Sequence, residues 1–342
     1  MKIPTTLTRS LSSSPPRFIH TSKPNLENQT LTLPDGRTLG FAEYGSPTGY
    51  PLLFFHGFPS SRLEAGSITK LAHRRNIRLF ALDRPGFGLS TFQPNRKILD
   101  WPADVFEFAH HVNIERFAVL GGSGGGPYAL ACARVLPHEM MSAVGLFASA
   151  GPWRAGTAGV PRLGHMTAMA VRSWPAGFTM VADAMVNFLK RTAQTDVVTR
   201  YLDGLLKDEK KESQLRRGEP EIGDKTVSAE ESVAERRELI FRIIFEAFAQ
   251  GARGTTQEAE LLSDLDWGFD FEDVDYDKVQ IWHGTQDKNA PVQQIRYLNE
   301  RLPHSILTEY DGSHFDLAKS KLEEVLAQLV PEAGSVENGP KT

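Results

Sequence analysis

One serine, Ser123, is surrounded by glycines in the stretch "FAVLGGSGGGPYALACA" (residues 117–133), between an apolar run and an alanine-rich run. The pattern Gly121-x-Ser123-x-Gly125 is typical of a nucleophile elbow, a sharp turn between a strand and a helix that exposes a serine hydroxyl. Glycines at these positions remove side chains that would collide where strand and helix meet. Pro127 suits the first helical turn, where its missing N–H has no partner to lose. We interpret Ser123 as a nucleophile.

Two other chemistries of glycine-rich turns fit this stretch less well. A dinucleotide fingerprint, Gly124-x-Gly126-x-x-Ala129, needs an acidic residue about 20 positions further on to hold a ribose. The next predicted strand, "GLFASAG", has no acid there. A P-loop needs a lysine and a hydroxyl residue at the start of the helix, whereas Pro127 and Tyr128 follow Gly126. The sequence therefore disfavours phosphate binding.

A serine nucleophile needs a base within hydrogen-bond reach and a carboxylate that orients the base. His314, in "YDGSHF", follows the last predicted strand in a loop near the C-terminus, where the order serine, acid, histidine requires the base. Asp287, in "WHGTQDKNAPV", lies in a loop at the carboxyl end of the preceding strand. Asp311 and Asp316 flank the histidine, but Asp311 is too near along the chain to approach its ring easily. We predict a catalytic triad of Ser123, His314 and Asp287.

Acyl transfer also needs donors for the anionic oxygen of the tetrahedral intermediate, each worth on the order of 10²–10³ in rate. In "FFHGFPSS", His56 and Gly57 follow a buried strand and turn the chain, so that the amide of Phe58 can point at the site. The amide of Gly124, directly after the nucleophile, is the second predicted donor. We interpret His56 as a group that stabilises this turn rather than as a base.

The elements that must position these groups alternate between strand-like and helix-like segments. Residues 30–45 predict an antiparallel hairpin with Pro34-Asp35-Gly36 in its turn. Continuous apolar runs, typical of strands buried on both faces of a parallel sheet, follow in "PLLFFHG", "IRLFALDRPGFG", "FAVLGG" and "SAVGLFASAG", with helices expected near 63–75 and 98–112.

The alternation stops after residue 151, because residues 152 to about 262 are mostly helical in pattern. This segment contains a mixed-charge run, "KDEKKESQLRRGEPEIGDK", that we interpret as a solvated surface. Two further strands, "VQIWHGTQDK" and "SILTEYDGSHF", precede a terminal helix at roughly 318–330. The pattern predicts an α/β fold with helices on both faces of the sheet, interrupted by a helical insertion.

These motifs, in this order, resemble the α/β-hydrolase superfamily, and more closely a serine-nucleophile branch with an H-G-x-P oxyanion loop. The resemblance covers residues 30–330, except for the weakly matched insertion, and is carried by "HGFPSSR", "DRPGFGLS", "GGSGGGPYALACA", "WGFD", "WHGTQDKNAPV" and "GSHF". It implies a mostly parallel eight-stranded sheet with an initial hairpin and a helical cap inserted after the sixth strand.

Applied to this sequence, the resemblance implies Ser123 as nucleophile and His314 as base and then acid, oriented by Asp287. It implies the amides of Phe58 and Gly124 as the oxyanion hole. In "DRPGFG", we interpret the aspartate and arginine, Asp83 and Arg84, as structural.

We therefore expect five segments. Residues 1–27 form a disordered or targeting segment, and residues 28–151 form the first part of the hydrolase core. Residues 152–262 form the cap, residues 263–332 the second part of the core, and residues 333–342 a disordered tail.

The predicted function is a serine hydrolase that cleaves an ester, thioester or lactone of a small, apolar molecule through an acyl-enzyme intermediate. Epoxide hydrolases and haloalkane dehalogenases carry an aspartate where this chain has Ser123, which disfavours their chemistry. An acyltransferase, a lyase or a carbon–carbon bond hydrolase on the same triad stays open, as does a non-catalytic receptor or scaffold. Trp153, Trp174, Phe178 and the "FRIIFEAF" helix could line a pocket or belong to the core; the substrate-binding residues stay unassigned.

Composition restricts the partners. With 38 basic and 42 acidic residues among 342, the net charge of −4 gives the chain no overall basic field for nucleic acid or anionic lipid. The single Cys132 excludes an internal disulfide framework and thiolate metal sites, and we interpret it as a packing residue. We expect a small-molecule substrate, no nucleic-acid partner, no cofactor and no metal; the oligomeric state stays open.

Localisation is predicted only from the N-terminus. The stretch "MKIPTTLTRSLSSSPPRFIHTSKPN" is basic, rich in hydroxyl groups and free of acids before Glu27, which is typical of a mitochondrial transit peptide. A cytoplasmic protein with a disordered tail is the alternative. No uninterrupted apolar run reaches membrane-spanning length, because Arg172 interrupts the most apolar stretch.

Overall fold

The computed structural model of this chain describes residues 26–204, 206 and 233–330. Three predictions fall wholly or largely outside these residues: the targeting or disordered segment, apart from its last two positions, the mixed-charge run at 207–225, and the C-terminal tail. These stay predictions.

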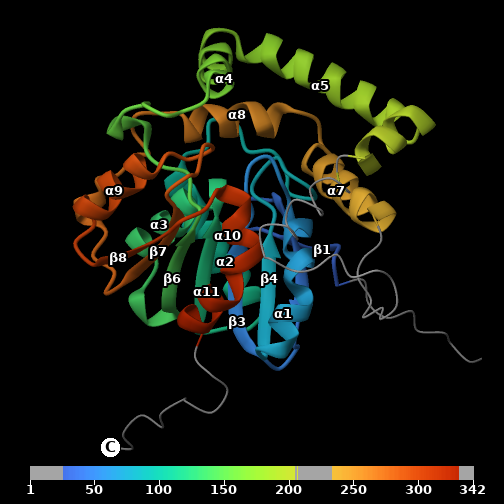
Figure 1. Cartoon of the computed structure of the whole chain (residues 1–342). Coiled ribbons are helices and arrows are strands. Elements are labelled where there is room, and N and C mark those ends of the chain that lie inside the picture. The colour runs from blue at the N-terminus through green and yellow to red at the C-terminus, as the bar shows by residue number, and fades with distance from the viewer. Residues whose placement is uncertain (1–25, 205, 207–232, 331–342) are drawn as a thin grey trace, which may run out of the picture.

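One eight-stranded sheet forms the centre of the molecule, in the order β1-β2-β4-β3-β5-β6-β7-β8 (Figure 1). The antiparallel pairs are β1 with β2 and β2 with β4, and all other neighbours are parallel. The mostly parallel eight-stranded sheet with an initial hairpin is thus confirmed. The strands are β1 (Gln29–Thr32), β2 (Thr38–Gly45), β3 (Tyr50–Phe55), β4 (Ile77–Leu82), β5 (Phe117–Gly122), β6 (Met141–Phe147), β7 (Val279–Gly284) and β8 (Ser305–Tyr310).

Helices cover both faces of the sheet, which explains why its central strands are continuously apolar. On one face, α2 (Trp101–His111), α3 (Gly126–Val135) and α9 (Val292–Arg301) contribute to one core cluster. On the other face, α1 (Thr69–Arg74), α10 (His314–Ser320) and α11 (Leu322–Leu329) contribute to the second. Cys132 of α3 is fully buried in the first cluster, and burial raises the pKa of its thiol well above the usual value.

Two predicted helices differ from those in the structure. The helix expected at 63–75 is a 3-10 turn, η1 (Arg62–Ile68), followed by the short α1. The terminal helix expected at 318–330 is two helices, because α10 begins at position 314 and ends before α11. Ser313 and Asp316 form a capping box that starts α10. His314, expected in a loop, is therefore the first residue of a helix.

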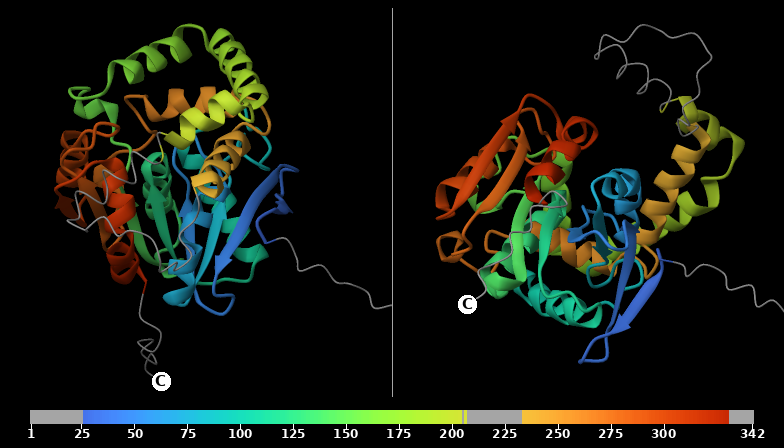
Figure 2. Two further views of the ribbon diagram at one scale, coloured as in Figure 1. Left: turned by 45° about the vertical axis from the view of Figure 1, so that its right-hand side comes forward. Right: turned by 90° about the horizontal axis from the view of Figure 1, so that it is seen from below.

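The helices between β6 and β7 include α4 (Arg162–Ser173), α5 (Pro175–Thr192), α7 (Val233–Ala247) and α8 (Arg253–Leu262). We call these the cap helices. Figure 1 shows α4, α5 and α8 above one end of the sheet and α7 beside that end, and Figure 2 shows the same helices from two further directions. A Cβ added to Gly124, just past the carboxyl end of β5, would lie 3.2 Å from the side chain of Leu262 in α8. Cap helix α8 therefore meets the sheet at the carboxyl end of β5, where the predicted nucleophile lies.

The remaining short elements are η2 (Ile98–Asp100), η3 (Ser123–Gly125), η4 (His138–Met140), η5 (Trp153–Ala155) and η6 (Phe271–Asp273). Within the described part of the chain, no helix combines the length and the apolar character needed to cross a membrane.

Candidate active site

Ser123 occupies a strained turn between β5 and α3. Its φ of +49° lies in the left-handed region, which L-residues rarely adopt and which is enriched at functional sites. The backbone is held there because the amide of Ala150 donates a hydrogen bond of 2.8 Å to the carbonyl oxygen of Ser123. The side chain is neither exposed nor fully buried. This geometry matches the nucleophile elbow predicted from the glycine spacing.

The glycines of the elbow are required by close backbone contacts. A Cβ on Gly121 would lie 2.5 Å from the carbonyl oxygen of Gly125, and a Cβ on Gly125 would lie 2.1 Å from that of Phe55. Both distances are far below van der Waals contact, and a backbone oxygen cannot rotate away as a flexible side chain could. The Gly-x-Ser-x-Gly pattern is therefore a steric requirement of the turn.

Asp287 and His314 are in direct contact. The Nδ1 of His314 lies 2.7 Å from Oδ2 of Asp287, whose other oxygen accepts the amides of Asn289 at 2.8 Å and Ala290 at 2.9 Å. Burial alone would raise the pKa of Asp287, but His314 and the Ala290 amide outweigh it and lower that pKa. The carboxylate is thus held ionised, and the Nδ1 proton donated to it leaves Nε2 free to accept a proton.

Ser123, Asp287 and His314 all lie at the side of the sheet where the parallel strands have their carboxyl ends. Strands β5, β7 and β8 are parallel, so Ser123, Asp287 and His314 all follow carboxyl ends at that side. The structure joins Asp287 to His314, whereas no hydrogen bond links Ser123 to His314 among the described side chains. In unliganded enzymes such bonds are often long and tighten when substrate binds.

The two predicted oxyanion donors are neighbours. A Cβ on Gly124 would lie 3.3 Å from the backbone nitrogen of Phe58 and 2.8 Å from its Cβ. The loop that carries Phe58 is held by Arg84, whose guanidinium donates to the carbonyl oxygen of His56 and, at 3.0 Å, to that of Gly57.

The hydrogen bonds from Arg84 to the carbonyl oxygens of His56 and Gly57 fix the orientation of the Phe58 amide. The Gly57 carbonyl and the Phe58 N–H belong to one planar trans peptide, so they point in opposite directions. The Gly57 oxygen also lies 2.8 Å from Nδ1 of His56, and Nε2 of His56 accepts the Arg84 amide at 3.2 Å. Burial and the charge of Arg84 hold the pKa of His56 well below its usual value. Neutral His56 therefore stabilises the turn, as expected, and the Phe58 N–H points away from Arg84.

Arg84 belongs to a fully buried cluster that sequence reasoning missed. Its Nε lies 2.8 Å from Oε1 of Glu258 in α8, and the other Glu258 oxygen is bound by Arg96 and, at 2.7 Å, by the hydroxyl of Tyr128. Burial alone would raise the pKa of Glu258, but the charges of Arg84 and Arg96 outweigh it and lower that pKa. The cluster connects cap helix α8 to the loop that carries Phe58.

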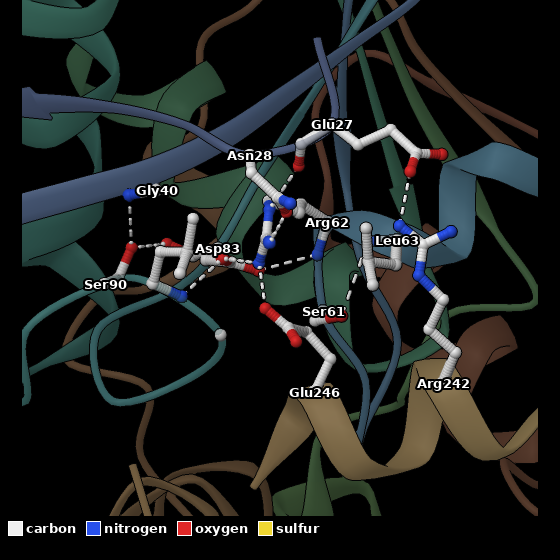
Figure 3. A network of polar contacts seen from close by, with 12 residues as sticks. Glu27, Asn28, Gly40, Ser61, Arg62, Leu63, Asp83, Ser90, Arg242 and Glu246 are labelled. Carbon is white, nitrogen blue, oxygen red and sulfur yellow. Dashed lines mark hydrogen bonds and ion pairs between the residues drawn. The ribbon is translucent and has the colours of Figure 1, made fainter. Parts of the chain in front are cut away.

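Asp83 belongs to a second network, shown in Figure 3. Its carboxylate accepts the backbone amide of Arg62 at 2.6 Å and lies 2.8 Å from the Arg62 guanidinium. The same guanidinium lies 2.6 Å from Glu246 of α7 and donates to the carbonyl oxygen of Glu27 at 2.7 Å. Through Arg62, Asp83 is therefore linked to the segment just before β1 and to a cap helix, which agrees with the structural role expected for Asp83.

A second residue that sequence reasoning missed, Glu64, lies near Ser123. Its Oε2 accepts the Gly57 amide at 2.8 Å. A Cβ on Gly57 would lie 3.4 Å from both that oxygen and the Cβ of Ser123. Burial raises the pKa of Glu64. The only sequence signal was an acid in the first turn after "HGFPSS", which is equally typical of any helix start.

A family model described as "alpha/beta hydrolase fold" matches residues 50–320. The chain belongs to the α/β-hydrolase family. Among curated relatives, the chain is 32% identical to Lipase 3 of Moraxella sp. (strain TA144) over 41% of its own length and 44% of that protein. It is 31% identical to the proline iminopeptidase of Xanthomonas citri over 30% of the chain and 34% of that protein. The match thus spans less than half the length of each.

Solved structures show the same fold as this chain. The esterase of Exiguobacterium antarcticum aligns with a TM-score of 0.55 and 19% identity over 88% of the chain and 98% of that structure. The enol-lactonase of Burkholderia xenovorans LB400 aligns with a TM-score of 0.55 and 16% identity over 88% of the chain and 99% of that structure. At these identities the likeness concerns the fold alone.

The aromatic residues considered for a pocket in the hydrolase have different surroundings. Phe241 and Phe245, in the "FRIIFEAF" segment of α7, line a cavity of about 750 Å³ together with Lys190 of α5. Trp174 is 67% exposed and so belongs neither to a core nor to that cavity. In the described part of the chain, no three histidine, cysteine, aspartate or glutamate side chains form a group that could hold a metal ion.

Proposed function

We propose that this α/β-hydrolase is a serine hydrolase that cleaves an ester, thioester or lactone of a small, apolar molecule. The observation that carries the proposal is the bond between His314 and Asp287, at the sheet edge where Ser123 occupies a strained turn. An oriented imidazole and a hydroxyl on a tight turn are two of the parts that acyl transfer requires.

In the first half-reaction, Ser123 Oγ attacks the substrate carbonyl carbon while its proton moves to Nε2 of His314. Asp287 holds the ring and stabilises the imidazolium that forms. The carbonyl oxygen becomes an anion, which the amides of Phe58 and Gly124 stabilise. When the tetrahedral intermediate collapses, the bond to the leaving group breaks, and His314 returns its proton to that group. The product is an acyl ester of Ser123.

In the second half-reaction, water attacks the acyl carbon and gives a proton to His314. Collapse of the second intermediate breaks the bond to Ser123 Oγ, which takes the proton back, and releases the carboxylic acid. An acyltransferase would differ only in the acceptor. Product analysis with and without a competing alcohol therefore separates the two activities.

Covalent labelling tests the proposal directly. A fluorophosphonate probe reacts with an activated serine, so we expect it to label the wild-type protein and not Ser123→Ala. Ser149→Ala is the matched control, because Ser149 precedes the residue whose amide holds Ser123 but donates only to the Ala150 carbonyl; it should be labelled like wild type. Folded wild-type protein that stays unlabelled would reject the proposal.

The hydrogen bonds from Arg84 to the loop that carries Phe58 lead to a further prediction. Arg84→Lys keeps a positive charge opposite Glu258, but an ammonium cannot reproduce the planar array of donors. We expect kcat for p-nitrophenyl acetate to fall by roughly 10–10²-fold with a smaller change in KM, because one oxyanion donor is displaced rather than removed.

The matched control for that prediction is Arg78→Lys, since Arg78 pairs with Glu43 between β4 and β2, away from the loop. It should leave kcat near the wild-type value. If Arg84→Lys is folded and equally active, Arg84 does not position the Phe58 amide.

A further inference from the structure

Two cap helices, α4 and α5, present their large apolar side chains to solvent. The residues that they bury are small: Ala168, Val171, Gly177, Ala182 and Val186. Their exposed residues are large, and each of the following is more than half exposed: Leu163, Met166, Met169, Met180, Met185 and Phe188. This reverses the usual pattern, in which a helix turns its large apolar side chains toward the core. Apolar surface exposed in this way marks an interaction site.

The exposed residues form stripes along each helix. On α4, Leu163 and Met166 are three positions apart, and on α5, Val181, Met185 and Phe188 are four and then three positions apart. Residues at this spacing share one face of a helix. In Figure 1, α4 and α5 form the outermost layer, with α8 between α4 and the sheet. We call these stripes, together with Trp174 between the two helices, the α4–α5 face.

The net charge of the segment formed by α4 and α5 is opposite in sign to that of the whole chain. Residues 162–192 contain four basic side chains, Arg162, Arg172, Lys190 and Arg191, and one acid, Asp183. The acid is directed toward the rest of the cap, because it accepts the amide of Ala252 at 2.7 Å. Arg172, which donates to the carbonyl oxygen of Ser263, and Lys190, whose Nζ lies 5.8 Å from the ring centre of Phe245, also contact the rest of the cap. Arg162 and Arg191 are exposed. The chain as a whole carries a net charge of −4. The overall charge therefore hides a local surface that is both basic and apolar.

We propose that the α4–α5 face docks this protein on the surface of an anionic lipid membrane. Helices with an apolar stripe, basic flanks and an interfacial tryptophan lie in the headgroup region of a bilayer. Anionic headgroups complement the exposed basic side chains, of which Arg162 and Arg191 lie at the outer ends of the two helices. A second copy of the chain fits less well, because symmetric pairing would bring the same basic residues toward one another.

Vesicle binding tests this inference with the full-length protein. In a sedimentation assay, most of the protein should pellet with vesicles that contain equal amounts of phosphatidylcholine and phosphatidylglycerol. Much less protein should pellet with vesicles of phosphatidylcholine alone. The double variant Met166→Ser, Phe188→Ser should lose this binding. Ile306→Ser is the matched control, because Ile306 is 54% exposed but lies on β8; it should bind like wild type.

Charge is tested separately. Arg162→Gln combined with Arg191→Gln should weaken binding to the phosphatidylglycerol vesicles by about fivefold for each residue replaced. None of these positions belongs to the proposed triad or the oxyanion loop, so fluorophosphonate labelling of Ser123 should stay at the wild-type level. A failure of the proposed function would therefore be seen separately from a failure of docking.

Two outcomes would overturn the inference. The first is absence of wild-type binding to both vesicle types. The second is self-association in solution that Met166→Ser, Phe188→Ser abolishes while vesicle binding is absent, which would assign the face to a second copy.

Discussion

Ser123→Ala is expected to lower kcat for p-nitrophenyl acetate by on the order of 10⁴–10⁶-fold, because the attacking atom of the acyl-transfer step is removed. The fold should persist. Alanine is as strained as serine at φ +49°, and no side-chain hydrogen bond of Ser123 is recorded among the described residues. We therefore expect the free energy of unfolding to change by less than about 1 kcal/mol. Steady-state kinetics and urea unfolding of the same samples measure both quantities.

The triad also predicts how substitutions combine. Because Ser123 and His314 act in one step, Ser123→Ala with His314→Ala should be about as inactive as Ser123→Ala alone. A Ser123→Ala protein that keeps near-native kcat would contradict the assignment. So would a double variant in which the two losses multiply, since they would then arise from independent steps.

The second large effect concerns stability. Glu258→Gln preserves the shape of the side chain but leaves the buried guanidinium groups of Arg84 and Arg96 without a counter-charge. Removing one partner of a buried ion pair costs about 3–5 kcal/mol, and we expect a loss of that size in the free energy of unfolding at pH 7. Urea denaturation measures it. Glu309→Gln, which breaks an ion pair with the half-exposed Arg296, should be far less destabilising.

The same site predicts a dependence on pH. The pKa of Glu258 in the folded protein is below the ordinary value of 4.5, so between these two values the unfolded chain binds more protons than the folded one. Stability from this group is therefore complete above pH 4.5 and is lost as the pH falls through the folded pKa. The difference in unfolding free energy between wild type and Glu258→Gln should shrink in that range. A difference independent of pH, or no difference at pH 7, would show that Glu258 is not held as an anion.

Local sequence predicted the strands well and the helix ends less well. Runs such as "IRLFAL" (β4) consist of residues that suit a sheet covered on both faces, so their pattern alone locates the strand. The start of α10 depends instead on the side chains of Ser313 and Asp316, which form a capping box. That signal spans only four residues, and the prediction of one terminal helix at 318–330 did not take it into account.

Some residues of the candidate site could likewise be predicted from the sequence, and others could not. Ser123, Asp287 and His314 were identified from a steric pattern and from their order along the chain, which are both readable in one dimension. Glu258 was not, because it meets Arg84 across 174 positions and Arg96 across 162. In the sequence it is simply one acid in a polar helix.

Local rules therefore decided where the strands lie and why glycines surround Ser123, since backbone sterics and side-chain periodicity act over a few residues. Only the folded chain decided that His314 contacts Asp287, that Glu258 is buried between two arginines, and that α4 and α5 expose their large apolar side chains. The physical reason is that desolvation and ion pairing depend on which distant segments meet, and no single segment contains that information.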